Sequence, residues 1–185
     1  MPDLSVMREL LVDEIIGSTG AEYGRCFALL KEDAPESKLK TVRIFDVSPN
    51  SVLINLDKFE QPKTLLKGGR GQRQRCDYVL LSIWQGTPIM LFVEMKSGTA
   101  QDSEIQRQFK GAECIMDFCN SVLKRFHDQD DFLGRFLKRF IVFYKPRLAK
   151  QRTRPVRPSQ KNDTPERAFK YPDPHNPTLK SLVWL

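Results

Sequence analysis

The chain has 185 residues, of which 40% are hydrophobic and 29% charged, with 30 Lys and Arg against 23 Asp and Glu. These proportions suit one globular domain with a sizeable core and disfavour a disordered chain or a coiled coil. No apolar run approaches the roughly 20 residues of a membrane helix, and the acidic N-terminal stretch lacks the basic start of a signal peptide. Four cysteines without CxxC spacing then predict reduced thiols in a cytoplasmic protein that has no zinc site and no membrane partner.

The first predicted element is an amphipathic helix over residues 3–16. Its apolar stripe consists of Leu4, Met7, Leu10, Leu11 and Ile15. Glu14 also lies on this stripe, whereas Glu9 and Asp13 point away from it. The first helix therefore carries one acid on its apolar side.

Two stretches rich in β-branched residues follow the helix, at 41–47 and 51–56. They flank Ser48-Pro49-Asn50, which is a turn signal, so we predict that they form a hairpin. The apolar stretch at 26–30 is too short to be assigned to a helix or a strand.

The most apolar part of the chain is formed by residues 77–84 and 89–96, which are typical of central strands covered on both faces. We predict a second hairpin from them, with residues 85–88 as a four-residue loop. The remaining predicted elements are a long helix at 103–126, an interior strand at 140–144 and an edge strand at 181–185. This order places the chain in the α/β class or, with a mixed sheet, the α+β class.

The net charge of +7 is concentrated in residues 145–180, which hold ten Lys and Arg, three Asp and Glu, and seven of the twelve prolines. Because proline removes backbone donors and fixes φ, we predict a core domain at 1–144 and an extended basic Pro-rich extension at 145–185. A second basic run, Lys63–Arg75, has five basic residues, three glycines and no acid. Charge alone leaves two interpretations open, namely solvated segments or arms that follow a phosphate backbone.

Three charged residues stand in the two most apolar strands: Asp77, Glu94 and Lys96. Charges in a buried strand are costly unless they are paired or bind a metal. With a four-residue loop, Asp77 lies opposite Lys96 and Val79 opposite Glu94, so the three side chains share one face. Neighbouring carboxylates repel each other unless a cation neutralises them, and Mg²⁺ prefers carboxylate and phosphate oxygens. With a lysine to position water, this set suits metal-dependent hydrolysis of a phosphodiester.

Cys76-Asp77 followed by Glu94-Met95-Lys96, across a hairpin of apolar strands, resembles the PD-(D/E)XK nuclease superfamily. The resemblance implies a restriction-endonuclease-like core of helix, three-stranded meander, helix and strand. It also implies that Asp77 and Glu94 bind Mg²⁺, for which Mn²⁺ substitutes, that the carbonyl of Met95 is a further ligand, and that Lys96 positions water. The chain departs from the family at Cys76, where proline is frequent, but this position does not bind metal.

Two helical residues extend the resemblance. Family members often place an acid of the first helix in the metal site, and Glu14 matches this by its position; the alternative is a glutamate whose carboxylate reaches solvent. Many members also carry a polar residue on the second helix that contacts substrate, and Gln108 interrupts the apolar stripe there; the alternative is a glutamine at the edge of the core. The loop that enters the strand of Asp77 would bring substrate to it through its basic residues, Lys67, Arg70, Arg73 and Arg75.

These observations favour a Mg²⁺-dependent nuclease whose substrate is DNA in preference to RNA. The alternative is a catalytically silent nucleic-acid-binding or assembly subunit with the same fold, against which the intact Asp77, Glu94 and Lys96 argue. A third interpretation is a structural Asp77–Lys96 ion pair with Glu94 reaching solvent. A chain of this size would act as a homodimer that cuts both strands or as a subunit of a larger nuclease complex.

Overall fold

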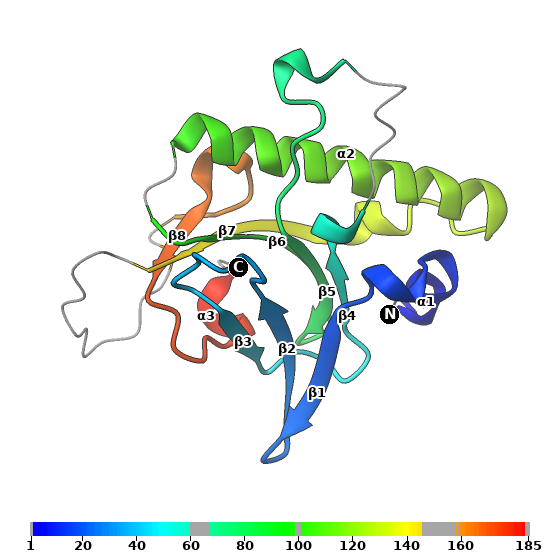
Figure 1. The fold of residues 1–185 in the computed structure, drawn as a ribbon. Coiled ribbons are helices and arrows are strands. Elements are labelled where there is room, and N and C mark those ends of the chain that lie inside the picture. The colour runs from blue at the N-terminus through cyan, green and yellow to red at the C-terminus, as the bar shows by residue number, and fades with distance from the viewer. Residues whose placement is uncertain (1, 60–66, 99–100, 146–157, 159, 184–185) are drawn as a thin grey trace.

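The computed structural model describes residues 2–59, 67–98, 101–145, 158 and 160–183 (Figure 1). The described residues form a mixed α+β fold with two sheets, as the order of the predicted elements indicated. The antiparallel three-stranded sheet consists of β1 (Ser18–Glu22), β2 (Arg25–Lys31) and β3 (Thr41–Phe45). The mixed five-stranded sheet consists of β4 (Val52–Asn55), β5 (Tyr78–Trp84), β6 (Thr87–Lys96), β7 (Leu137–Tyr144) and β8 (Phe169–Pro172) in that order.

Among the described residues the helices are few, and only one of them is long. The α-helices are α1 (Ser5–Leu10), α2 (Asp102–Phe126) and α3 (Leu179–Leu182). Short 3₁₀ segments are η1 (Asp13–Ile15), η2 (Leu56–Lys58), η3 (Gly68–Arg70), η4 (Leu133–Arg135) and η5 (Pro165–Arg167). In the described ranges, no helix has the length and apolar character needed to cross a membrane.

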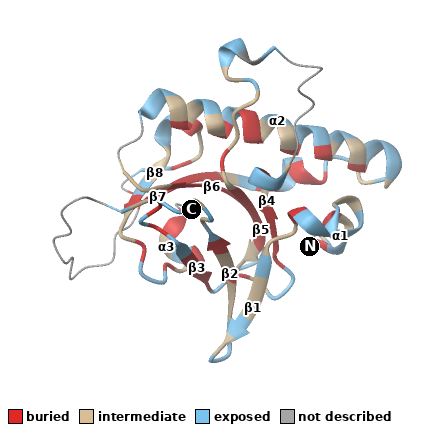
Figure 2. Ribbon diagram, in the orientation of Figure 1, coloured by how far each residue is buried: buried red, intermediate tan, exposed pale blue. Residues whose placement is uncertain are grey.

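The five-stranded sheet is buried on both faces, as the continuous apolar character of β5 and β6 predicted (Figure 2). On one face lies α2, which confirms the predicted long helix, and Phe109 of α2 meets the ring of Phe140 edge-on at 5.2 Å. Phe140 in turn stacks on Phe92 at 4.8 Å. Against the other face pack the three-stranded sheet and α3.

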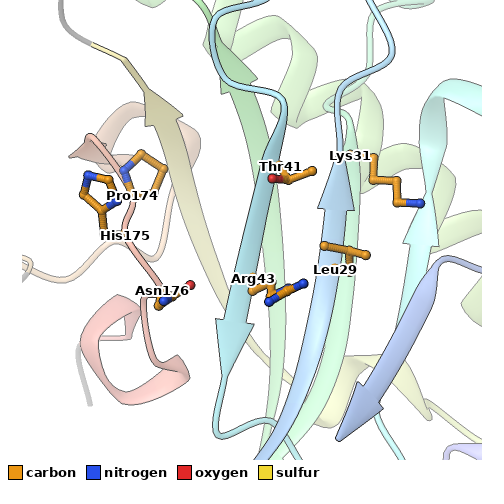
Figure 3. A pocket seen from close by; sticks show the side chains of 7 residues that line it. All are labelled: Leu29, Lys31, Thr41, Arg43, Pro174, His175 and Asn176. Atoms are coloured by element: carbon orange, nitrogen blue, oxygen red, sulfur yellow. The ribbon is translucent and has the colours of Figure 1, made fainter. Parts of the chain in front are cut away.

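The three-stranded sheet turns only one face to the core. Ala28 and Leu30 of β2 are fully buried against the five-stranded sheet, together with Ile44 of β3. Because successive side chains of a strand alternate, Lys31 and Arg43 lie on the outer face (Figure 3). This outer face is exposed and basic.

The central hairpin is closed by the two-residue turn Gln85-Gly86 instead of the predicted four-residue loop 85–88. Both residues have positive φ, 49° and 80°, as a type I′ turn requires. Trp84 therefore pairs with Thr87, and the register differs by two residues from the predicted one. Because side chains alternate with a period of two, this shift leaves every residue on its predicted face.

The predicted helix over residues 3–16 is too long, because α1 ends at Leu10. The chain then turns toward the five-stranded sheet, where Ile16 forms an antiparallel bridge with Ile54. Ile15 is buried in the core from η1 and not from a helical stripe. The apolar spacing continued past the helix because Leu11 and Ile15, which follow it, also pack on the core.

The predicted hairpin of 41–47 and 51–56 is wrong in its pairing, although both stretches are strands. β3 pairs with β2, whereas β4 pairs with β5, so the turn between them connects two sheets. The hydroxyl of Ser51 donates to that of Ser82 at 2.8 Å, which ties this turn to β5. The unassigned stretch 26–30 belongs to β2, whose partner β1 is too poor in large apolar residues to be recognised from its pattern.

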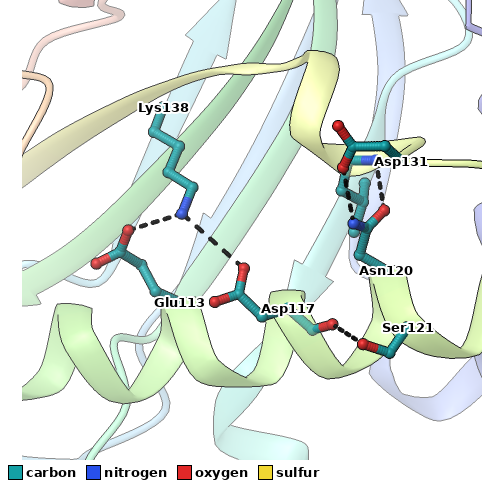
Figure 4. Close-up of polar contacts among 7 residues, drawn as sticks. Glu113, Asp117, Asn120, Ser121, Asp131 and Lys138 are labelled. Atoms are coloured by element: carbon teal, nitrogen blue, oxygen red, sulfur yellow. Dashed lines mark hydrogen bonds and ion pairs between the residues drawn. The ribbon is translucent and has the colours of Figure 1, made fainter.

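Polar contacts tie α2 to β7 and to the segment that leads into it (Figure 4). The ammonium group of Lys138 lies 2.9 Å from a carboxylate oxygen of Glu113. The side chain of Asn120 accepts the amide N–H of Leu133 at 2.8 Å and donates to Asp131 at 3.1 Å. These bonds fix the C-terminal half of α2 over the sheet.

The C-terminal segment departs from its prediction. Residues 181–185 were expected as an edge strand, but Ser181 and Leu182 belong to α3, whose N-terminus carries a capping box between Thr178 and Ser181. The edge strand is instead β8, which pairs with β7 in parallel. Leu179 and Leu182 are fully buried, so the described part of the segment packs on the core. The division at 144 and 145 stays a prediction, and residues 146–157 of the basic arm lie outside the described residues.

Candidate active site

The start of β5 and the end of β6 bring Asp77, Glu94 and Lys96 together on the sheet face that α2 covers. The last paired residues are Tyr78 and Val93, so Asp77 and Glu94 occupy the next positions on neighbouring strands. In the predicted register, Asp77 would instead have faced Lys96. The three side chains nevertheless lie together, because a register shift of two residues keeps each of them on the same face of the sheet.

Lys96 forms its ion pair with Glu94, at 2.6 Å between Nζ and Oε1, and lies 3.7 Å from Glu104 of α2. Glu94 itself is only 1% exposed. The amide N–H of Met95 donates to Asp77 at 2.6 Å. The third interpretation, an Asp77–Lys96 pair with Glu94 in solvent, is therefore wrong.

Gln108 reaches the same site from α2. Its amide nitrogen donates to Oε1 of Glu94 at 2.8 Å, so this oxygen receives both Gln108 and Lys96. The second carboxylate oxygen of Glu94 and the amide oxygen of Gln108 are buried and have no hydrogen-bond partner among the described residues. A buried polar atom without a partner is costly, and a carboxylate oxygen in that condition is suited to receive a donor or a cation.

Burial, together with the charge of a neighbouring carboxylate, raises the pKa of both carboxyls. Burial raises the pKa of Glu94 to about 7, although Lys96 and Gln108 oppose the shift. Burial, followed by the charge of Glu94, raises the pKa of Asp77 well above its usual range. Burial alone would lower the pKa of Lys96, but the charge of Glu94 raises it above its usual value. The lysine is therefore held in its protonated form.

A third carboxyl that the sequence did not single out, that of Asp57, lies near these groups in η2. The amide N–H of Leu56 donates to the backbone oxygen of Asp77 at 2.8 Å, which brings η2 beside the start of β5. Although Asp57 is exposed on one side, partial burial of its carboxyl raises its pKa. The positive charges of Arg75 and Lys96 oppose that shift. Only the pairing of β4 with β5, which the sequence pattern did not reveal, places Asp57 here.

The basic residues predicted to bind substrate occupy different environments. The guanidinium group of Arg75 donates to the backbone oxygen of Leu56 and, at 3.0 Å, to that of Asp57. It thereby holds η2 in place, which is a structural role that the sequence did not predict. Lys67 and Arg70 are exposed, and Arg73 is half-buried. Residues 60–66, the first part of this loop, lie outside the described residues.

Glu14 does not join Asp77 and Glu94. Because α1 ends early, Glu14 lies in η1 with its side chain exposed, and not on a helical stripe that faces the sheet. Within the described ranges, no group of three or more His, Cys, Asp or Glu residues is arranged to hold a metal ion. The carboxylates that the structure does bring together are those of Asp77 and Glu94.

Comparisons of this chain with protein-family models, with curated proteins and with solved structures found no match. The chemistry of the site must therefore be inferred from its own residues.

Proposed function

We propose that this chain is a Mg²⁺-dependent nuclease of the PD-(D/E)XK type, which hydrolyses DNA in preference to RNA. The observation that carries the proposal is the meeting of the buried Glu94, the half-buried Asp77 and the protonated Lys96 where β5 begins and β6 ends. One oxygen of Glu94 has no hydrogen-bond partner among the described residues. We further propose that it acts in the cytoplasm, as a homodimer or as a subunit of a larger nuclease complex.

The order of the elements supports this proposal. After α1 come the three strands of the smaller sheet, β1–β3; strands β4, β5 and β6 then form an antiparallel meander, and α2 connects β6 to β7, which runs parallel to it. Apart from the inserted strands β1–β3, this order is the helix, meander, helix and strand expected of a restriction-endonuclease-like core. In addition, Asp77 lies where β5 begins, and Glu94 and Lys96 lie where the neighbouring strand β6 ends.

The donor set fits a hard divalent cation. Asp77 and Glu94 offer carboxylate oxygens, and the raised pKa of both groups reflects an environment in which a cation would favour the ionised forms. These two residues, with the carbonyl of Met95, would hold Mg²⁺ or Mn²⁺. When bound, such an ion would stabilise the charge that develops on the phosphate.

The other residues of the site would act on water and substrate. Lys96 is protonated and lies between Glu94 and Glu104, so it suits orientation of the attacking water better than removal of a proton from it. Gln108 holds one oxygen of Glu94, and this leaves the second oxygen available. The exposed cations Lys67 and Arg70 would contact the phosphate backbone.

The test is cleavage of labelled single- and double-stranded DNA and RNA with Mg²⁺, Mn²⁺ or EDTA. Lys96→Ala should abolish metal-dependent cleavage, and Lys138→Ala should not. Lys138 is a matched control, because it also projects from the sheet and pairs with a glutamate of α2, Glu113. Cleavage that persists in Lys96→Ala at the wild-type rate would refute the proposal.

The second candidate is a catalytically silent nucleic-acid-binding or assembly subunit. The closed Glu94–Lys96 pair favours it, because such a pair also satisfies a purely structural need. Salt-sensitive binding of DNA or RNA without cleavage under any metal condition would support this candidate against the nuclease.

A further inference from the structure

A cavity of about 550 Å³ lies at the outer face of the three-stranded sheet (Figure 3). The five-stranded sheet separates the three-stranded sheet from α2 (Figure 1). Its lining consists of Leu29, Lys31, Thr41, Arg43, Pro174, His175 and Asn176. Figure 3 shows Thr41 and Arg43 on β3 between the side chains of β2 and the segment 174–176. The lining contains three basic side chains and no acid, so the cavity is suited to an anion.

The walls of this cavity are fixed by backbone hydrogen bonds. On one side of segment 174–176, the amide N–H of Asp173 donates to the backbone oxygen of Tyr144 at 2.8 Å. On the other side, the amide N–H of Phe45 donates to the backbone oxygen of Pro177 at 2.8 Å. The segment is therefore held at one end by the last residue of β7 and at the other end by the last residue of β3, and the cavity is formed before any ligand arrives.

Two cations of the lining have donors to spare. In the part of the chain that the structure describes, no carboxylate lies within ion-pair distance of the ammonium group of Lys31. Arg43 lies over the ring of Phe27 at 5.5 Å and contacts Glu22 through one nitrogen at 3.2 Å. A guanidinium group carries five N–H donors, so this single contact leaves most of them available to a phosphate.

The side chain of His175 already has a partner. The ring of His175 lies 3.2 Å from a carboxylate oxygen of Asp173, which stands beside the cavity. Thr41 and Asn176 add a hydroxyl and an amide, and Leu29 and Pro174 add apolar surface. The lining thus combines groups that hold phosphate with groups that contact a sugar and a base.

We propose that this cavity binds a phosphate-bearing ligand of the size of one nucleotide. Its volume falls in the range of small-molecule sites, about 300–1,000 Å³, and Lys31 and Arg43 would hold the phosphate. The ligand is either a free nucleotide or one nucleotide unit of a strand. The proposal does not depend on the nuclease proposal, because none of the lining residues belongs to β5, β6 or α2.

The test is calorimetric titration of the full chain with adenosine 5′-monophosphate, with inorganic phosphate as a second probe. Arg43→Gln and Lys31→Gln should each weaken nucleotide binding about tenfold, the loss expected for one charged hydrogen bond. Arg25→Gln is the matched control. Arg25 stands on the same face, pairs with Asp46 at 2.8 Å, lies over Phe45 at 4.8 Å and is 48% exposed against 47% for Arg43, but it does not line the cavity.

If a single-stranded oligonucleotide competes with the nucleotide, the proposal is supported and the source of the phosphate is a strand. If the nucleotide binds but the oligonucleotide does not compete with it, the proposal is supported and the ligand is a free nucleotide. Three outcomes would overturn the proposal: no nucleotide binding, an equal loss in all three variants, or phosphate binding as tight as nucleotide binding. Thermal melts of each variant establish that it is folded. Lys96→Ala should retain nucleotide binding in full, so that failure of the nuclease proposal and failure of this one can be told apart.

Discussion

The backbone oxygen of Gln74 lies directly against Gly111 of α2, in the space that a Cβ atom on Gly111 would occupy. The end of the basic loop is thereby in van der Waals contact with the helix, three residues before Asp77 and three residues after Gln108. This contact sets the position of β5 relative to α2. Glycine at position 111 is therefore part of the construction of the candidate active site.

Gly111→Ala should destabilise the protein, although alanine is the better helix former by about 1 kcal/mol. Because the added Cβ meets backbone and not a movable side chain, we expect a net loss of roughly 1–3 kcal/mol in the free energy of unfolding. Nuclease activity should fall with it, since Asp77 moves relative to Gln108. Gly69→Ala is the control, because a Cβ there meets nothing within 4 Å. Urea unfolding and cleavage assays measure both effects, and wild-type stability in Gly111→Ala would contradict the structure.

Gln108→Ala should lower the cleavage rate about tenfold. The substitution removes a 2.8 Å hydrogen bond to Glu94, and a bond to a charged group contributes about 1.5–3 kcal/mol. Gln106→Ala, on the same helix and also half-buried, should cleave at the wild-type rate. Steady-state kinetics measure the cleavage rates of both variants. Equal cleavage rates for Gln108→Ala and Gln106→Ala would show that Gln108 is only a residue at the edge of the core.

Mn²⁺ and Mg²⁺ should raise the melting temperature of the wild-type chain, because a ligand that binds only the folded state stabilises it. Asp77→Asn should lose this increase, since the variant keeps the shape of the side chain and removes one charged ligand. Glu14→Gln should keep it, because Glu14 is exposed in η1. Melting curves with and without metal give this answer without an activity assay. An increase that depended on Glu14 would restore the position predicted from the sequence.

Arg75→Ala and Arg70→Ala should have opposite consequences. Arg75 bonds to two backbone oxygens of η2, so its loss should lower the free energy of unfolding by about 1–2 kcal/mol. Arg70 is exposed, so its loss should leave stability unchanged while it weakens nucleic-acid binding and reduces the salt dependence by about one phosphate contact. Unfolding curves, together with binding measured over a range of salt concentrations, separate the two roles. Destabilisation by Arg70→Ala equal to that by Arg75→Ala would contradict this assignment.

Much of the candidate site could be predicted because it depends only on the alternation of side chains. Asp77, Glu94 and Lys96 share a face in any register that differs by an even number of residues, so the error in the turn at Gln85-Gly86 did not separate them. Likewise, the apolar stripe of α2 identified the face that meets the sheet, and Gln108 interrupts that stripe.

The sequence alone thus determined the periodicity of apolar residues in each segment and the burial of that segment, because both are local properties of the chain. The tertiary structure decided which segments pair: β3 with β2, β4 with β5, and β8 with β7. Strand pairing is a competition among distant segments for the same edges, and the pattern within one segment carries no record of its partner. That pairing places Asp57 beside Asp77 and forms the cavity around Lys31 and Arg43. Like the end of α1 before Glu14, these arrangements could not have been revealed by the sequence alone.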